Sequence, residues 1–132
     1  MTIESNKQTV LHFIREMARG QLDVTLLTED AHWWVPGIGD VSRAQFLQMV
    51  EQFNSLADGP TRMDIVAVTA EDNRVAVEAN GHAKLKDGRI YANTYHFLFY
   101  LHEGKIRHAR EHNNSAIPAA LFGTSLSAAA ST

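Results

Sequence analysis

Three polar residues in the second half of the chain, Asn80, Tyr95 and Glu111, lie in segments that alternate between apolar and polar residues, as β-strands do. If short hairpin turns join these strands, Asn80 lies opposite Tyr95, and Tyr95 lies opposite Glu111. Neighbouring strands are about 4.8 Å apart, so on a concave sheet the three side chains converge. A carboxylate, a phenol and an amide at one place are suited to proton transfer, with Glu111 as the general base.

The face that carries this row depends on the register of the strands. A two-residue turn at 87–88 pairs Lys86 with Arg89, and a three-residue turn at "HEG" pairs Leu101 with Lys105. A change of one residue in the second turn would place every side chain of the last strand on the other face. With these turns, the predicted pocket face carries Glu78, Asn80, His82, Asn93, Tyr95, Phe97, Ala109, Glu111 and Asn113.

Each of these polar residues also has a structural interpretation. Glu111 could be a carboxylate that accepts a hydrogen bond from Tyr95 or pairs with an arginine. Tyr95 could be a half-buried strand aromatic whose hydroxyl is satisfied. Asn80 and Asn93 could orient a water or a carbonyl group, or they could form hydrogen bonds across the strands. Glu78 could be the second member of an acid/base pair or a solvated residue at the rim of the sheet.

The chain contains seven histidines and no cysteine, which excludes disulfides and thiolate chemistry. His108 and His112 have the i, i+4 spacing that binds metal on a helix. On a strand the same spacing separates them by about 13 Å, so we predict no metal site and no cofactor. His82 could shuttle a proton near pH 7, or it could lie exposed near the end of its strand.

The stretch "DAHWWVPGIGD", residues 30–40, contains two adjacent tryptophans. Its apolar run predicts a strand that ends at Pro36. Because side chains alternate along a strand, one indole must lie on each face of the sheet. One tryptophan therefore lines a core or a cavity, and the other must be covered in a different way.

The remaining pattern predicts helices in the first half of the chain and strands in the second. Ser5 and Gln8 have the spacing of a capping box for a first helix, and Ser42 and Gln45 have it for a later one. Asp23 could cap a short helix over 24–27. The order predicts an α+β fold with the helices packed on one face of a curved antiparallel sheet. The predicted strands are 63–70, 74–85, 90–101 and 105–114, separated by "EDN", "KDG" and "HEG".

Composition narrows the class of protein. The chain has 132 residues, of which 45% are hydrophobic and 20% charged, and its net charge of −3 offers no basic surface for nucleic acid. We find no signal-peptide pattern and no apolar stretch of membrane-spanning length, so we expect a cytoplasmic protein. We expect one domain over 1–123 and a flexible tail over 124–132, with "AIPAALFG" as a short lid or an interface segment.

The run "GRIYANTYHFLFYLHEGKIRHAREHNN", with "AHWWVPG" upstream, resembles the nuclear-transport-factor-2-like superfamily. More narrowly, it resembles the branch that contains polyketide cyclases, ketosteroid isomerases and limonene epoxide hydrolase. The resemblance implies a cone-shaped curved sheet around the N-terminal helices, a deep apolar pocket, and a homodimer formed through the outer face of the sheet. It also places Trp34 and His32 on the pocket side, and Trp33 on the other face.

Few catalytic residues of these related enzymes have a counterpart of the same type in this chain. Glu111 corresponds to the water-activating aspartate of limonene epoxide hydrolase, but its companion arginine and aspartate are replaced by Glu78 and Asn80. The ketosteroid-isomerase base corresponds to Trp34 or Val35, and its helix-borne tyrosine falls near Phe13, which has no hydroxyl. The resemblance therefore predicts the pocket and not the reaction.

These observations predict a small cofactor-free enzyme that performs acid/base chemistry on an apolar, oxygen-bearing small molecule, by isomerisation, hydration, dehydration or cyclisation. The predicted catalytic residues are Glu111, Tyr95, Asn80 and Glu78. The alternative is a non-catalytic dimeric module that binds a hydrophobic ligand or a protein. The predicted cavity-lining residues are Trp34, His32, Phe13, Met17, His82, Asn93, Phe97 and Asn113.

Overall fold

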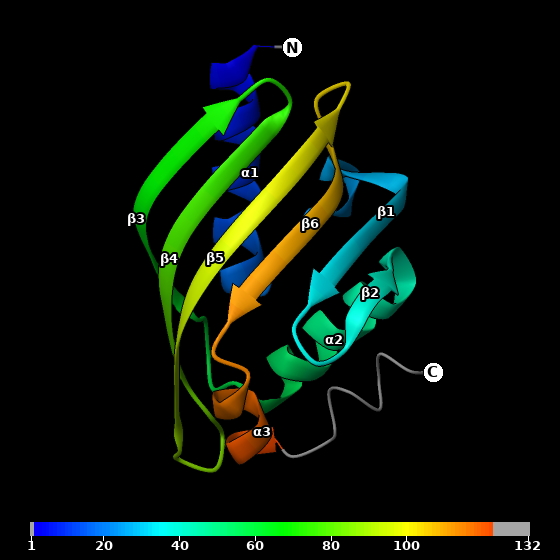
Figure 1. The fold of residues 1–132 in the computed structure, drawn as a ribbon. Helices are drawn as coiled ribbons and strands as arrows, with labels where there is room; N and C mark the ends of the chain where they lie inside the picture. Colours follow the sequence, from blue (N-terminus) through cyan, green and yellow to red (C-terminus); the bar gives the residue numbers. More distant parts are fainter. Residues whose placement is uncertain (1, 123–132) are drawn as a thin grey trace.

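The helices and strands predicted from the sequence occur in the predicted order, which confirms the α+β class; a helix over 116–122 was not predicted. The computed structural model describes residues 2–122, and the predicted tail, 124–132, lies outside the described residues. The helices of this part are α1 (Ile3–Ala18), the 3₁₀ turn η1 (Val24–Leu26), α2 (Arg43–Leu56) and α3 (Ala116–Phe122). The strands are β1 (Leu27–Val35), β2 (Gly39–Ser42), β3 (Arg62–Glu71), β4 (Arg74–Lys84), β5 (Ile90–His102) and β6 (Lys105–Asn113) (Figure 1).

The six strands form one curved sheet in the order β2-β1-β6-β5-β4-β3. Strands β1 and β6 are parallel, and the other neighbours are antiparallel. Helices α1 and α2 lie on the concave side of the sheet, and α3 follows the carboxyl end of β6 (Figure 1). Strand β2 was not predicted, because the sequence pattern ended the preceding strand at Pro36 and began the next helix at the Ser42 cap. Within residues 2–122, no helix is both long and apolar enough to cross a membrane.

The two long helices begin at hydrogen-bonded caps. The second predicted capping box is confirmed, since the Ser42 hydroxyl accepts from the Gln45 backbone N–H and the Gln45 side chain accepts from the Ser42 N–H. The first helix begins earlier than predicted, and its capping box is formed by Thr2 as the N-cap and Ser5 as the reciprocal partner. The Gln8 amide instead donates to Glu4 one turn away.

The β4–β5 hairpin differs by one residue from the predicted register. The Leu85 N–H donates to the Arg89 carbonyl and the Gly88 N–H donates to the Leu85 carbonyl, so the loop has three residues and Gly88 has a φ of 89°. Such a loop, a turn followed by a left-handed residue, is a common alternative to the two-residue hairpin. It pairs Asn80 with Thr94, and it exchanges the two faces of β4 relative to the prediction.

The β5–β6 hairpin has a shorter turn than predicted, but the predicted face is kept. Glu103 and Gly104 form a two-residue turn with φ values of 50° and 80°. A bulge between Tyr100 and Leu101 then shifts the register by one further residue. The two deviations add to a shift of two residues, so Glu111 stays on the concave face.

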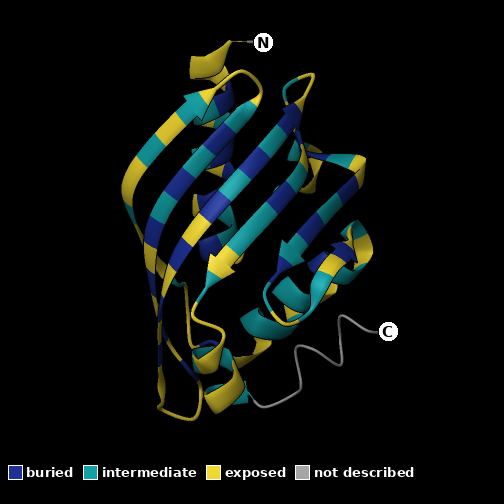
Figure 2. Cartoon of the chain, viewed as in Figure 1, coloured by how far each residue is buried: buried dark blue, intermediate teal, exposed yellow. Residues whose placement is uncertain are grey.

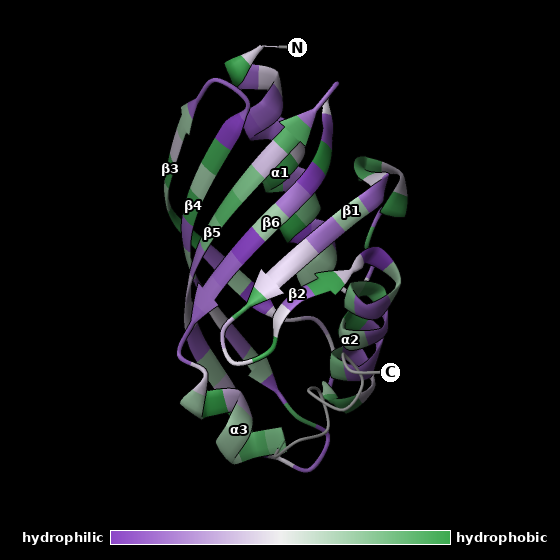
Figure 3. Cartoon of the chain, turned by 45° about the vertical axis from the view of Figure 1, so that its right-hand side comes forward, coloured by the Kyte–Doolittle hydropathy of each residue, from purple (hydrophilic) through white to green (hydrophobic). Residues whose placement is uncertain are grey.

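Alternating burial along β4 and β5 shows which face holds the core (Figure 2). The concave face carries the buried apolar residues, and hydrophobic and hydrophilic residues alternate along the strands (Figure 3). Phe13 of α1 packs against Trp33 and Phe99, with ring centroids 5.7 and 6.2 Å apart. Phe13 is fully buried and belongs to the core, so the prediction that it lines the cavity was wrong.

Candidate active site

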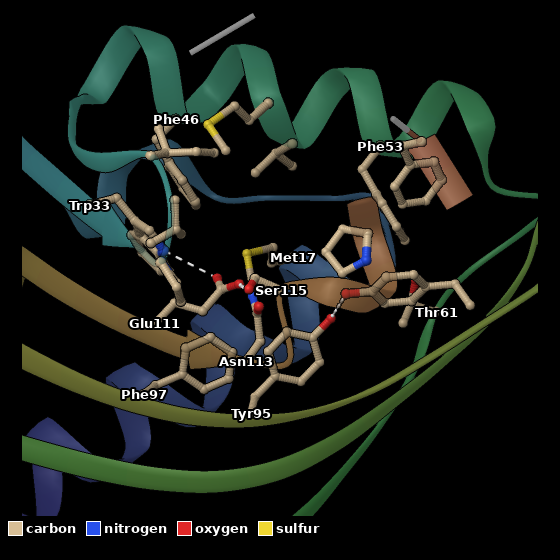
Figure 4. Close-up of a pocket in the computed structure, with 18 of the residues that line it drawn as sticks. Met17, Trp33, Phe46, Phe53, Thr61, Tyr95, Phe97, Glu111, Asn113 and Ser115 are labelled. Carbon is tan, nitrogen blue, oxygen red and sulfur yellow. Dashed lines mark hydrogen bonds between the residues drawn. The ribbon is translucent and has the colours of Figure 1, made fainter. Parts of the chain in front are cut away.

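A cavity of about 400 Å³ lies between the concave face of the sheet, helix α2 and helix α3 (Figure 4). Its volume falls in the range of small-molecule sites, about 300–1,000 Å³. Most of its wall is apolar, with Met17, Phe46 and Phe53 among the lining residues. Residues of α3 also line it, as expected if "AIPAALFG" covers the cavity. Among the described lining residues, Glu111 is the only carboxylic acid, and none is a histidine, lysine or arginine.

Glu111 is held by one hydrogen-bond donor on each carboxylate oxygen. The Trp33 indole Nε1 donates to Oε1 at 3.2 Å, and the Asn113 amide donates to Oε2 at 2.7 Å (Figure 4). Burial raises the pKa of Glu111, and the hydrogen bonds from Asn113 and Trp33 only partly oppose this effect. A fixed carboxylate with a raised pKa suits a general base that works near neutral pH.

The pairing of three strands explains why these groups meet. Trp33 on β1 lies opposite Ala109 on β6, so the next inward-facing residue of β6, Glu111, is its diagonal neighbour. On the other side of β6, Tyr95 of β5 lies opposite Asn113. The indole, the carboxylate, the amide and the phenol therefore belong to adjacent positions on one face of the sheet.

A second hydrogen-bonded chain ends at Tyr95. The hydroxyl oxygens of Tyr91 and Tyr95 lie 2.5 Å apart, and the Asn93 amide donates to the Tyr91 oxygen at 3.1 Å. Asn93 is itself fixed, because its Oδ1 accepts from the backbone N–H of Asn114 at 3.0 Å. With Asn93 donating to Tyr91, Tyr91 can donate to Tyr95, which leaves the Tyr95 proton for a ligand oxygen.

The tyrosine hydroxyls are suited to donate hydrogen bonds and not to act as bases. Burial raises the pKa of Tyr91, and it raises the pKa of Tyr95 well above its ordinary value. Both phenols therefore stay neutral at physiological pH. The Tyr95 ring is also held in place by Phe97, with ring centroids 5.3 Å apart and planes 5° from parallel.

The structure brings five of the predicted site residues together at the cavity wall: Glu111, Tyr95, Asn113, Phe97 and Met17. Asn93 lies behind the wall, where it supports Tyr91. The prediction did not include Tyr91, although its i, i+4 spacing to Tyr95 on one strand indicated a shared face.

The prediction chose the wrong tryptophan. Trp33 is 2% exposed, lines the cavity and contacts Glu111, and it stacks on Phe46 with ring centroids 4.0 Å apart. Trp34 lies on the outer face, where the Arg110 guanidinium sits 4.1 Å from its ring centroid. His32 has the same parity as Trp34 and also lies on the outer face, bonded to Asp40 and not to the cavity.

Three further predicted residues, Glu78, Asn80 and His82, lie on the outer face because of the one-residue shift in the β4–β5 hairpin. Asn80 and His82 are exposed, and Glu78 pairs with His96 at 3.4 Å. None of them reaches the cavity. The apolar residues of β4, such as Val77 and Ala79, occupy the concave face instead, where they are buried.

Comparison with protein families gives a match over most of the chain. The model of the SnoaL-like domain matches residues 10–109. No protein of curated function matches the chain in sequence.

Solved structures of the same fold are similar over nearly the whole length. AclR from Streptomyces galilaeus, named a "putative hydroxylase", is 15% identical with a TM-score of 0.80, over 93% of this chain and 98% of that chain. A "putative polyketide cyclase" from Xanthomonas campestris pv. campestris is 22% identical with a TM-score of 0.75, over 86% and 93%. An NTF2-like protein of unknown function from Burkholderia pseudomallei is 17% identical with a TM-score of 0.75, over 92% and 98%. At these identities the likeness concerns the fold.

Proposed function

Because this chain belongs to the SnoaL-like family, we propose that its cavity is the active site of a small acid/base catalyst that acts on an apolar carbonyl compound. The observation that carries the proposal is the Glu111 carboxylate, fixed by Trp33 and Asn113 at the wall of an apolar cavity. A desolvated carboxylate is costly to bury, and it needs a functional reason where a neutral residue would fill the same space.

The proposed reaction begins with proton abstraction beside the carbonyl group. A Glu111 oxygen takes a proton from the adjacent carbon, so the C–H bond breaks, an O–H bond forms, and the electron pair moves to the carbonyl oxygen. Tyr95 donates a hydrogen bond to that oxygen as its negative charge develops, supported by Tyr91 and Asn93. Return of the proton to another carbon isomerises the compound. Attack of the enolate on a second carbonyl, followed by protonation of the new alkoxide, closes a ring.

The wall of the cavity favours a neutral, largely apolar substrate. The described lining residues include three methionines, four phenylalanines and no cation that would pair with a carboxylate or a phosphate. The polar lining residues that hydrogen-bond to one another are Glu111 with Asn113, and Tyr95 with Tyr91 (Figure 4). Asn54, Thr61 and Ser115 are the other polar residues of the wall. We therefore propose a substrate with one reactive carbonyl end and an apolar ring system, which is the chemistry of polyketides, terpenoids and steroids.

Hydrogen–deuterium exchange tests this proposal without knowledge of the natural product. Proton NMR in D₂O measures how fast a ring ketone such as 2-tetralone loses the signals of the protons next to its carbonyl. We expect the protein to accelerate exchange, and E111Q to reduce the acceleration about 10²–10⁴-fold. The matched control is E78Q, which changes a glutamate on the outer face of the same sheet and leaves exchange unchanged.

The alternative function, a non-catalytic module that binds a hydrophobic ligand, gives a different result in the same samples. The ketone would then quench the fluorescence of Trp33 in the cavity wall, but exchange would equal that of buffer in both the wild type and E111Q. Equal acceleration by the wild type and E111Q would also reject Glu111 as the base. A homodimer through the outer face is compatible with either function, and light scattering in solution tests it.

A further inference from the structure

Two histidines and an aspartate gather on the outer face of the sheet, away from the cavity. They are His32 on β1, Asp40 on β2 and His108 on β6, and we call them the outer triad. One ligand-type atom of each residue lies within 4.8 Å of those of the other two. None of the three lines the cavity, so nothing in the proposed catalytic function uses them.

The pairing of the strands builds this cluster. His32 and His108 are direct partners across the parallel strands β1 and β6, and Asp40 is paired with the residue two positions after His32. The two imidazole rings stack with centroids 3.9 Å apart and planes 17° from parallel. The ring of Tyr100 stacks on His108 with a centroid separation of 5.4 Å. His108 is thus held in place between two rings.

Within the outer triad, His32 and Asp40 are hydrogen-bonded to each other, but His108 has no comparably short contact. The Asp40 carboxylate lies 2.8 and 3.0 Å from His32 Nδ1. His108 Nε2 is buried, and its nearest polar group is Asp40 Oδ1 at 3.5 Å, which is too long for a good hydrogen bond. The close contact between His32 and Asp40 therefore leaves the buried ring nitrogen of His108 with only a long, weak contact, which is unfavourable. A cation shared by the three side chains would satisfy this nitrogen as well.

We propose that the outer triad binds a divalent transition-metal cation of the zinc type. Two imidazole nitrogens and one carboxylate are ligands that Zn²⁺ prefers, whereas Mg²⁺ and Ca²⁺ prefer oxygen alone. Tetrahedral Zn²⁺ places its nitrogen and oxygen ligands about 3.3 Å from one another. The 3.5 Å between Asp40 and His108 already suits this geometry, and the 2.8 Å between Asp40 and His32 needs to open by about half an ångström.

The position of the triad favours a structural role for the cation. It would join β2, β1 and β6, and β2 is an edge strand of only four residues. The Asp40 side chain is 51% exposed, so the cation can reach the triad from solvent. We expect zinc to stabilise the fold by binding the folded state alone.

Titration calorimetry with zinc chloride, on tag-free protein stripped with a chelator, tests the proposal. We expect one ion per chain and a rise in the melting temperature with added zinc. D40N, which changes an exposed side chain with little risk to folding, weakens binding roughly tenfold or more, and H108Q does the same. The matched control is H96Q, which removes an outer-face histidine that pairs only with Glu78 among the described contacts, and it leaves binding unchanged.

Three results would overturn the proposal. No heat of binding and no change in melting temperature at millimolar zinc would show that the triad is an ion pair only. Undiminished binding in D40N would assign the zinc to other histidines, as would a loss in H96Q equal to that in H108Q. These outcomes are independent of the exchange assay, because the cavity lies on the other face of the sheet.

Discussion

The two faces of the sheet use the same types of residue for different purposes. On the concave face, the few polar side chains are buried or partly buried, and hydrogen bonds hold Glu111, Tyr95 and Asn93 in place. On the outer face, charged residues are numerous and form solvent-exposed ion pairs, such as the pair of His96 with Glu78. Even neighbouring residues differ in this way, since Trp33 is buried and Trp34 lies under Arg110.

The comparison of Glu111 with Glu78 shows what makes a carboxylate a candidate base. Both are glutamates on the same sheet, and both had been predicted to face the pocket. Burial raises the pKa of Glu111, whereas the Glu78 side chain is 43% exposed and its ion pair is weakened by water. The residue type is equal in the two cases, so the environment decides the chemistry.

After E111Q, the largest expected effect on exchange comes from the tyrosines, and it should differ between the two faces of the sheet. Y95F removes the proposed hydrogen bond to the developing oxyanion, and we expect it to lower the exchange rate about 10²–10³-fold. Y91F leaves the Tyr95 hydroxyl in place but removes its support, so a smaller loss is expected. Y100F, on the outer face, should have no effect on exchange. NMR of ketone exchange measures all three variants.

A different ranking would change the assignment. If Y91F lowered exchange more than Y95F, Tyr91 would be the direct donor, since both hydroxyls belong to residues of the cavity wall. If neither changed the rate while E111Q did, the oxyanion would be stabilised by Asn113 or by water. Circular dichroism of each variant verifies that the fold is kept.

The next effect concerns the small residue beneath Tyr95. A Cβ at Gly81 would lie 2.8 Å from Tyr95 Cε2, closer than carbon atoms approach in proteins, and the ring cannot retreat because Phe97 stacks on it. We expect G81A to destabilise the fold by about 1–3 kcal/mol and to slow exchange, measured by thermal denaturation and NMR. The double variant G81A/Y95L relieves the clash, so it should recover stability without recovering exchange. Equal stability of G81A and the wild type would contradict this close packing.

The hairpin loops explain which parts of the site could be predicted from the sequence. The helix and strand order followed from apolar periodicity. Glu111 was placed on the correct face although its hairpin has a shorter turn than predicted and a bulge that was not predicted. The face of β4 was wrong because "KDG" permits a two-residue or a three-residue loop, and the difference of one residue exchanges the faces. The buried run of Val75, Val77 and Ala79 contained the information needed to choose.

The tryptophans were assigned incorrectly for another reason. A strand requires that Trp33 and Trp34 lie on opposite faces, but local sequence does not distinguish which face is inside. The answer depends on pairing between β1 and β6, which are about 75 residues apart in the chain and parallel. The outer triad depends on the same non-local pairing, together with β2, which had not been predicted. Spacing along one strand could therefore exclude His108 with His112, but it could not find His108 with His32.

The pH dependence of stability sharpens the comparison of the two glutamates. Since burial raises the pKa of Glu111, the folded state keeps this proton to a higher pH than the unfolded state does. The stability that Glu111 contributes is therefore present below its unfolded pKa and is lost as the pH rises through its folded pKa. Relative to the wild type, E111Q should become more stable from pH 4 to pH 8, by about 1.4 kcal/mol for each unit by which the pKa is raised.

Chemical denaturation of matched variants at several pH values measures this effect. E78Q should differ from the wild type by less than about 0.5 kcal/mol at every pH, because its ion pair with His96 is largely solvated. A constant difference between E111Q and the wild type would show that Glu111 has an ordinary pKa in the folded state. In that case the desolvation argument for the base would fail.

The smallest expected effect belongs to the outer tryptophan. W34F keeps an aromatic ring but weakens the contact with Arg110, which costs about 0.5–1 kcal/mol, and it leaves ketone exchange unchanged. W33F should cost more, since it removes the stacking partner of Phe46 and leaves Glu111 Oε1 without its indole donor. Losing that donor raises the pKa of Glu111 further, so the pH at which exchange reaches half its maximum should rise in W33F and not in W34F. The reverse pattern would mean that the outer indole, and not the inner one, controls the carboxylate, which the 3.2 Å contact between Trp33 and Glu111 argues against.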